Sequence, residues 1–114
     1  MSDYVLRGEV WDVDFDPVVG HAQGGRRPAL IVSNDRLHAI PSALVTILPI
    51  TTRDRGIRAH VRVAPPEGGL TAPTVVITEQ VRTISRLRLV RRRGAVSEQA
   101  LATVERRLRY FLDL

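Results

Sequence analysis

The sequence predicts a mainly β (α+β) fold, a small curved antiparallel β-barrel closed by a C-terminal helix. Short apolar runs rich in branched residues recur along the chain and are separated by turn residues, as in small barrels. A single amphipathic helical pattern stands at the C-terminal end. The 114 residues suffice for one domain with a modest core, so we expect residues 1–114 to form a single domain.

The first half of the chain carries three expected strands. Residues 9–15 alternate apolar and polar side chains with period two until Asp16-Pro17, which is typical of a half-buried strand. Residues 29–33 and 44–50 are short apolar runs that indicate strands buried on both faces. Asn34-Asp35 can cap a short helical turn between them.

The second half alternates turns with further short strands. Residues 53–56, Arg-Asp-Arg-Gly, predict an exposed and mobile loop, which we expect to act as a flap over the ligand. Residues 60–63 alternate like an edge strand and precede the turn-rich segment 65–69. Residues 74–78 predict another strand, and residues 80–84 continue the sheet beyond a bend.

A closing helix is predicted after Ser97, which is a favourable N-cap residue. Apolar side chains then recur on one helical face, at Leu101, Val104, Leu108, Phe111 and Leu112. We expect this face to close the barrel.

The composition favours a phosphate-rich partner. All 17 basic residues are arginine and the net charge is +5, and guanidinium groups bind phosphate bidentately and stack on bases. A solvated basic face that binds no ligand is the competing interpretation. The absence of cysteine excludes disulfides and thiolate metal sites. The apolar runs are too short to cross a bilayer and the first residues lack a signal-peptide pattern, so we expect a cytoplasmic protein.

Charge is segregated along the chain. Residues 1–20 hold five acids and one arginine, whereas residues 82–93 hold six arginines and no acid. The acidic segment is either a polar strand face or a screen for the basic surfaces. We interpret Arg91-Arg92-Arg93 as a solvated run and Arg82 as a structural or dimer-contact residue.

The segment from Gly24 to Pro28, Gly-Gly-Arg-Arg-Pro, is the strongest candidate for a binding site. Its glycines permit backbone conformations that a side chain forbids, and two arginines follow at once. The stiff apolar run after Pro28 anchors the segment. This arrangement favours binding of an oxyanion, and phosphate is the first candidate.

Six motifs occur in order from Arg7 to the C-terminal helix. They are Arg7-Gly8-Glu9-Val10-Trp11, Asp14-Phe15-Asp16-Pro17-Val18-Val19-Gly20, Gln23-Gly24-Gly25-Arg26-Arg27-Pro28, Ser33-Asn34-Asp35, Pro49-Ile50-Thr51 and Glu79-Gln80-Val81-Arg82-Thr83. In these motifs the chain resembles the MazF/PemK family. The resemblance implies a toxin of a toxin–antitoxin system: a sequence-specific endoribonuclease that cuts single-stranded RNA, often messenger RNA, without a metal or other cofactor and so inhibits translation and growth.

The resemblance also implies the fold and the partners. Family members are homodimers of a MazF/PemK/CcdB-like barrel. A cognate MazE-like antitoxin covers the RNA groove with an acidic segment that is disordered before it binds.

The family's catalytic residues fall on Arg27 and Thr51 of this sequence. The resemblance implies attack of a ribose 2′-hydroxyl on the adjacent phosphate, which gives a 2′,3′-cyclic phosphate and a 5′-hydroxyl end. Arg27 would stabilise the charge that develops on the phosphate, because a guanidinium with a pKa above about 12 is a poor acid or base near neutrality. Thr51 would donate a hydrogen bond or orient the phosphate. The expected RNA-binding residues are Phe15, His21, Gln23, Gly24, Gly25, Arg26, Thr52, Arg53 and Gln80.

Three questions remain open at the level of sequence. Ala22 stands where many relatives carry glutamate, so the general base is unassigned, and His21 is either its substitute or an exposed bystander. Phe15 either stacks on a base or belongs to the core. Two other functions compete with the ribonuclease: a catalytically silent module that binds RNA or antitoxin, and a gyrase-poisoning toxin of the same fold. For the gyrase toxin, neither the 24–28 turn nor Thr51 has an evident purpose.

Overall fold

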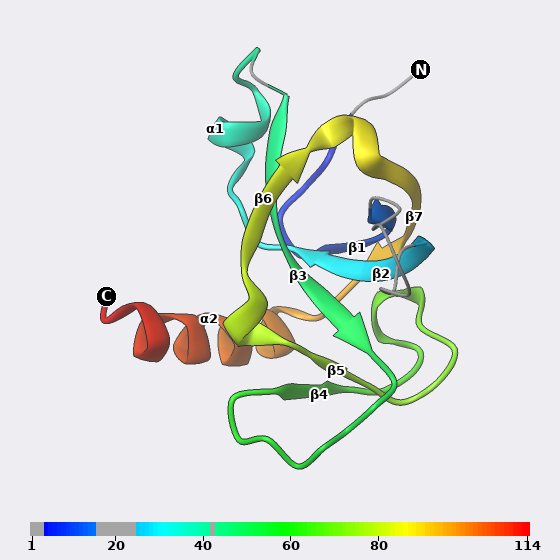
Figure 1. Cartoon of the computed structure of the whole chain (residues 1–114), viewed down its shortest axis with the longest axis vertical. Helices are drawn as coiled ribbons and strands as arrows, with labels where there is room; N and C mark the ends of the chain where they lie inside the picture. Colours follow the sequence, from blue (N-terminus) through cyan, green and yellow to red (C-terminus); the bar gives the residue numbers. More distant parts are fainter. Residues whose placement is uncertain (1–3, 16–24, 42) are drawn as a thin grey trace, which may run out of the picture.

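The computed structural model describes residues 4–15, 25–41 and 43–114. The chain forms a curled antiparallel sheet with one long helix packed against it (Figure 1). Seven strands follow in the order β4-β5-β3-β2-β1-β7, with β6 paired to β3. The expected mainly β fold, a curved antiparallel barrel with a C-terminal helix, is confirmed, and the curled sheet forms a half-barrel.

The elements of the described residues are short apart from the C-terminal helix. The strands are β1 (Glu9–Phe15), β2 (Gly25–Ile31), β3 (Leu44–Thr51), β4 (Val61–Val63), β5 (Thr74–Val76), β6 (Arg82–Ser85) and β7 (Leu89–Ala95). The α-helices are α1 (Asp35–His38) and α2 (Glu98–Leu112), and the 3₁₀ turns are η1 (Glu67–Gly69), η2 (Thr78–Gln80) and η3 (Arg86–Arg88).

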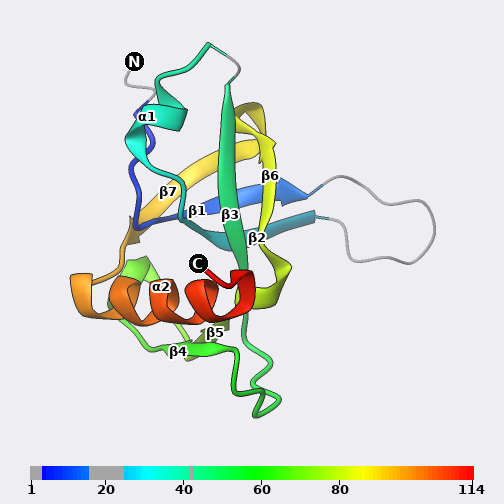
Figure 2. The same ribbon diagram turned by 90° about the vertical axis from the view of Figure 1, so that its left-hand side faces the viewer.

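Strand β3 organises the sheet. One of its edges pairs with β2, and the other pairs first with β6 and then, near its C-terminal end, with β5. Because two strands share that edge, the sheet turns around β3, and β4 and β5 lie below the rest of the sheet in Figure 2. The C-terminal end of β3 therefore meets the start of β2, the β3–β4 loop and η2 in one region.

The two faces of the sheet bury two apolar clusters. One cluster includes Val10, Leu30 and Leu48 and packs against α2, and the other includes Val13, Ile31 and Ile47 on the opposite face. Neighbouring strand residues enter different clusters because side chains alternate across a strand. Because both faces of the central strands are buried, their sequences are nearly continuous apolar runs.

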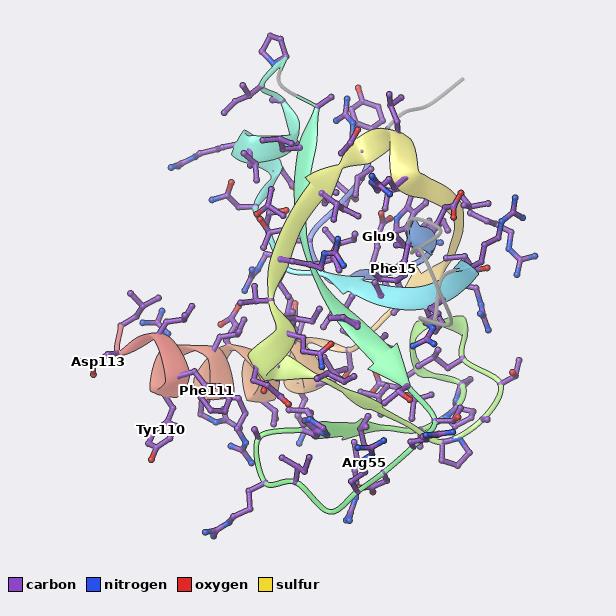
Figure 3. The ribbon with its side chains drawn as sticks, viewed as in Figure 1. Glu9, Phe15, Arg55, Tyr110, Phe111 and Asp113 are labelled. Carbon is purple, nitrogen blue, oxygen red and sulfur yellow. The ribbon has the colours of Figure 1, made fainter. Side chains whose placement is uncertain are left out.

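Helix α2 begins where the sequence predicts. The Ser97 hydroxyl oxygen accepts a hydrogen bond from the N–H of Ala100 at 3.1 Å. The first apolar positions, at Leu101, Val104 and Leu108, pack against the sheet. The prediction is wrong for Phe111 and Leu112, which are 43% and 51% exposed. The last turns of α2 extend beyond the sheet, and Figure 3 shows Tyr110 and Phe111 on this projecting end.

Strand β2 begins earlier than expected. Gly25 opens it with φ +99°, which confirms that the backbone here needs glycine, and Arg26 and Arg27 are strand residues that pair with β1. Pro28 lies inside the strand opposite Asp12. The missing N–H of Pro28 is tolerated because the ladder to β3 reaches only Ala29.

Other boundaries follow the expectations within a few residues. Asn34 caps α1, accepting from the N–H of Leu37 at 3.1 Å. Residues 53–56 are exposed and without regular structure, as expected, and their mobility stays a prediction. The predicted strand 74–78 ends at Val76, and the bend that follows is the 3₁₀ turn η2, so Gln80 belongs to the bend rather than to the next strand.

The arginine run at 91–93 lies in strand β7. The expectation of a simply solvated run is therefore wrong, because its side chains form ion pairs with β1. Arg93 donates to Asp12 at 3.0 Å with its side chain only 18% exposed, and Arg92 donates to Glu9 at 2.7 Å. Antiparallel pairing of β1 with β7 brings the acidic and basic segments together. The charge segregation seen in the sequence therefore marks two neighbouring strands.

Glu9 is a buried carboxylate held by this pairing. It accepts hydrogen bonds from the backbone N–H of Leu6 at 2.9 Å, the indole N–H of Trp11 at 3.0 Å and the guanidinium of Arg92 at 2.7 Å. Burial raises the pKa of Glu9, but these hydrogen bonds and the Arg92 charge outweigh burial and hold the pKa below its usual 4.5. A depressed folded-state pKa stabilises the fold above the unfolded-state value, and this stabilisation is lost as pH falls through the folded-state value.

We expect Glu9→Gln to lower the free energy of unfolding at pH 7 by about 1–3 kcal/mol, because it removes the charge that three donors surround. The deficit should shrink as pH falls below 4.5, because Glu9 is protonated first in the unfolded chain and then, at lower pH, in the folded protein. Denaturant unfolding at pH 7 and below pH 4 measures both. Asp14→Asn, an exposed change on the same strand, is the control, and an equal loss in both variants would contradict the prediction.

The second stability prediction concerns Gly69, which has φ +66° and would place a β-carbon 2.0 Å from the carbonyl oxygen of Arg93 in β7. We expect Gly69→Ala to destabilise the protein by more than about 3 kcal/mol, because the contact is with backbone that cannot move aside. Gly56→Ala is the matched control: φ is +69°, but nothing lies within 4 Å. It should cost only about 1–2 kcal/mol. Similar losses in thermal unfolding would show that the close approach is unimportant.

No helix among the described residues is long and apolar enough to cross a membrane.

Candidate RNA-cleavage site

A cavity of about 570 Å³ opens where the start of β2, the end of β3, the β3–β4 loop and η2 meet. Polar and charged side chains dominate its wall. The lining residues used below are Arg27, Thr51, Thr52, Arg53, Arg55, His60, Glu79 and Gln80. The guanidinium groups outnumber the one carboxylate, so the cavity suits an anion.

Strand pairing brings Arg27 and Thr51 together. Ala29 pairs with Pro49 in the antiparallel β2–β3 ladder, and continuing this register by two residues sets Arg27 across from Thr51. The ladder makes no further pair beyond Ala29 and Pro49, and Pro28, the next residue toward the start of β2, has no N–H that could extend it. The two strands can therefore separate, and the cavity lies between them.

Thr51 begins the turn that leaves β3. Its hydroxyl oxygen accepts a hydrogen bond from the backbone N–H of Arg53 at 3.1 Å. A hydroxyl that accepts through oxygen still has its own hydrogen to donate. Thr51 can therefore orient the loop and also donate to a ligand in the cavity.

The β3–β4 loop is held at its tip by Asp54. The carboxylate accepts from the backbone N–H of Gly56 at 2.9 Å and from the guanidinium of Arg62 in β4 at 2.7 Å. These two hydrogen bonds, the Gly56 one first, hold the pKa of Asp54 below its usual 3.8. The ionised carboxylate thus links the loop that carries Arg53 and Arg55 to β4 through hydrogen bonds that are exposed to solvent.

His60 and Glu79 form the titratable pair of the cavity wall. His60 Nε2 lies 2.9 Å from Glu79 Oε2, and the His60 side chain is only 6% exposed. Burial raises the pKa of Glu79, but the hydrogen bond from His60, the backbone N–H of Glu79 and the positive charge available on His60 together lower it below 4.5. Because an ionised carboxylate only accepts, Nε2 carries a hydrogen, and in the neutral ring Nδ1 is left as an acceptor.

The structure brings five predicted site residues into the cavity wall: Arg27, Thr51, Thr52, Arg53 and Gln80. Phe15, Gly25 and Arg26 are not among its lining residues. Half-buried Phe15 packs against the apolar cluster, and Arg82 Cζ lies 5.4 Å from its ring centroid. Figure 3 shows Phe15 well apart from Arg55 of the β3–β4 loop. His21, Ala22, Gln23 and Gly24 lie outside the described residues.

Sequence reasoning missed three residues of the cavity wall: Arg55, His60 and Glu79. The Arg55 signal was present, because the residue lies inside the loop expected to cover the ligand. Glu79 adjoins Gln80 in a motif that was used for the resemblance. His60 was assigned to an edge strand, and nothing in its local sequence indicates that η2 would bring a carboxylate to its ring.

Comparisons with known proteins identify the family of the chain. Residues 6–112 match the family described as PemK-like, MazF-like toxin of type II toxin–antitoxin systems. The chain is 36% identical to endoribonuclease MazF9 of Mycobacterium tuberculosis, over 95% of this chain and 96% of the relative. It is 32% identical to endoribonuclease EndoA of Bacillus subtilis, over 96% of each.

Among solved structures, the crystal structure of MazE–MazF from Deinococcus radiodurans matches with a TM-score of 0.81 and 29% identity, over 96% of each chain. Fold, motif order and cavity agree with a family match that spans nearly the whole sequence. This chain therefore belongs to the PemK-like, MazF-like toxin family of type II toxin–antitoxin systems.

Proposed function

We propose that this chain is the endoribonuclease toxin of a type II toxin–antitoxin pair. Family membership and the relatives named endoribonuclease support the activity. The observation that carries the proposal is the cavity whose wall holds both Arg27, near the start of β2, and Thr51, at the end of β3. Such a site offers a bidentate cation and a hydroxyl donor to one phosphate.

We further propose that the substrate is single-stranded RNA, most often messenger RNA, cut at a short recurring sequence without a metal. The 2′-hydroxyl attacks its own phosphate, the bond from phosphorus to the 5′ oxygen breaks, and a 2′,3′-cyclic phosphate and a 5′-hydroxyl result. Arg27 donates two charged hydrogen bonds to the phosphorane oxygens, and Thr51 adds a third donor. Thr52, Arg53 and Gln80 line the path of the flanking nucleotides.

The partners we propose follow from the same family. The Deinococcus radiodurans structure is a complex of MazE with MazF, a related mycobacterial endoribonuclease is solved in complex with its cognate antitoxin, and an acidic MazE-like segment complements the arginines of the cavity. We also propose that residues 1–114 are one domain, that the toxin is a homodimer and that it acts in the cytoplasm. Light scattering of the purified protein tests the dimer.

The decisive experiment incubates the protein with a long single-stranded RNA in excess chelator and maps both ends of every fragment. We expect cuts at one short recurring sequence that leave 5′-hydroxyl and cyclic-phosphate ends. Binding of RNA without new ends would support a silent binding module instead. Failure to bind RNA together with inhibition of gyrase would support the gyrase-poisoning alternative.

A further inference from the structure

His60 differs from the other buried histidine of the described chain. His38 has a partner at each ring nitrogen, with Nδ1 2.6 Å from the carbonyl oxygen of Val5 and Nε2 2.6 Å from the hydroxyl of Ser33. His60 has Glu79 at Nε2, while its buried Nδ1 has no hydrogen-bond partner among the described residues. Buried polar atoms are nearly always paired, so an unpaired one beside a cavity is a position for a water or for a ligand group.

The position of this nitrogen suggests which ligand group would bind there. His60 lines the same cavity as Arg27 and Thr51, and when its ring is neutral and Nε2–H is donated to Glu79, its Nδ1 accepts. A phosphate oxygen is itself an acceptor and cannot fill that role. A hydroxyl group can, and the hydroxyl that accompanies a phosphate in RNA is the ribose 2′-hydroxyl.

We propose that His60 is the general base of RNA cleavage, with Glu79 as the residue that positions its ring. This inference rests on the proposed function and deepens it. Arg27 and Thr51 stabilise the phosphate, and neither removes a proton near neutrality. Imidazole is the side chain whose protonation changes most readily between about pH 5 and 8.

The step balances in protons and bonds. His60 Nδ1 takes the hydrogen of the 2′-hydroxyl as the 2′ oxygen bonds to phosphorus. The bond from phosphorus to the 5′ oxygen breaks, and that oxygen takes a proton from water. The imidazolium, held by the Glu79 carboxylate at 2.9 Å, then returns its proton to solvent. No oxidant, reductant or co-reactant is needed.

RNA must reach a nitrogen that is enclosed in the free protein, and the adjoining loop provides the means. Residues 52–58 are exposed and lack regular structure. The backbone N–H of His60 donates to the backbone carbonyl oxygen of Ile57 at 3.0 Å, so His60 stands at the end of this loop. Movement of the loop when RNA binds opens Nδ1 while Glu79, on η2, keeps the ring in place.

Several charges surround the pair and contribute to its titration. They are Asp54, Arg53, Arg55 and Arg58 of the β3–β4 loop, Arg62 of β4, Arg27 of β2, Glu67 of η1 and Arg107 of α2. The pKa of Asp54 is lowered first by its Gly56 hydrogen bond and least by His60, whereas the His60 hydrogen bond is the largest lowering effect on the pKa of Glu79. The pH profile is therefore compared between variants rather than interpreted from one protein alone.

The test uses a DNA oligonucleotide with a single ribonucleotide at a cleavage site mapped for the wild-type protein. We expect His60→Gln to lower the single-turnover rate by about 10²–10⁴, the usual contribution of a general base. The rise of rate with pH that reflects loss of the imidazole proton should disappear. Binding to the all-DNA oligonucleotide, which has no 2′-hydroxyl to deprotonate, should change less than about threefold.

His38→Gln is the matched control, because it replaces a buried histidine that does not line the cavity. It should keep the rate and the pH profile. If His60→Gln keeps the wild-type pH profile, or if its lost rate equals lost binding, the proposal is overturned. If wild-type protein makes no cut, the proposed function fails instead.

Glu79→Gln supplies a second test that does not depend on folding of the His60 variant. Without the carboxylate the protonated imidazole is less favoured, so the rise of rate should move to lower pH. The rate should also fall by at least about tenfold, because the ring is less well oriented. An unchanged profile in Glu79→Gln would overturn the pairing of these two residues in the reaction.

Discussion

Replacement of Arg27 by alanine is expected to lower the rate of RNA cleavage by about 10³ or more and to leave the fold intact. One preorganised donor to a developing oxyanion is worth about 10²–10³ in rate, and a guanidinium supplies two such donors. Arg27 lies on β2 in the cavity wall, opposite Thr51 in the extended register. Single-turnover cleavage of a mapped RNA measures the loss, and thermal unfolding checks the fold.

Two arginine controls separate this role from net charge. Arg109→Ala removes the same charge from α2, away from the cavity, and should keep the rate within about twofold. Arg26→Ala removes the exposed neighbour on β2 and should act mainly on binding, with a smaller dependence on salt. Equal losses in Arg27→Ala and Arg109→Ala would mean that Arg27 contributes only long-range attraction.

Much of the fold could be predicted because local patterns and tertiary packing agree. The period-two alternation of residues 9–15 is strand β1, and Ser97 caps α2 as its chemistry predicts. The wrong predictions concern segments whose structure depends on contacts with residues far away in the sequence. Nothing in the local sequence of Arg91-Arg92-Arg93 indicates a strand. The three arginines lie in β7 because Glu9 and Asp12 of the adjacent strand β1 form ion pairs with them. Helical periodicity likewise could not indicate where α2 runs past the edge of the sheet.

The site residues also divide into those that the sequence identifies and those that only the folded structure identifies. Arg27 and Thr51 were found through motifs, and the register between β2 and β3 brings them to one cavity. His60 could not be found, because its importance depends on Glu79 of η2, 19 residues further along the chain. A pair assembled by tertiary contact leaves no spacing signal. Burial and an unpaired nitrogen, both properties of the folded chain, identify it.

Replacement of Thr51 by valine is expected to lower the cleavage rate by about 10², because one hydrogen-bond donor to the phosphate is lost. Valine has nearly the same shape, so the cavity keeps its volume. The N–H of Arg53, which donates to the Thr51 hydroxyl at 3.1 Å, lies on an exposed loop and can bind water instead. The loss should therefore appear in the single-turnover rate and not in thermal stability.

Serine at the same position separates chemistry from packing. Thr51→Ser keeps the hydroxyl and loses only a methyl group, so its rate should lie within about tenfold of the wild-type rate. Thr83→Val removes a hydroxyl that pairs with Thr46 at 2.8 Å on the β3–β6 ladder, outside the cavity wall, and should leave cleavage unchanged. If Thr51→Ser were as slow as Thr51→Val, the methyl group rather than the hydroxyl would matter. Thr51 would then shape the turn after β3 instead of contacting the phosphate.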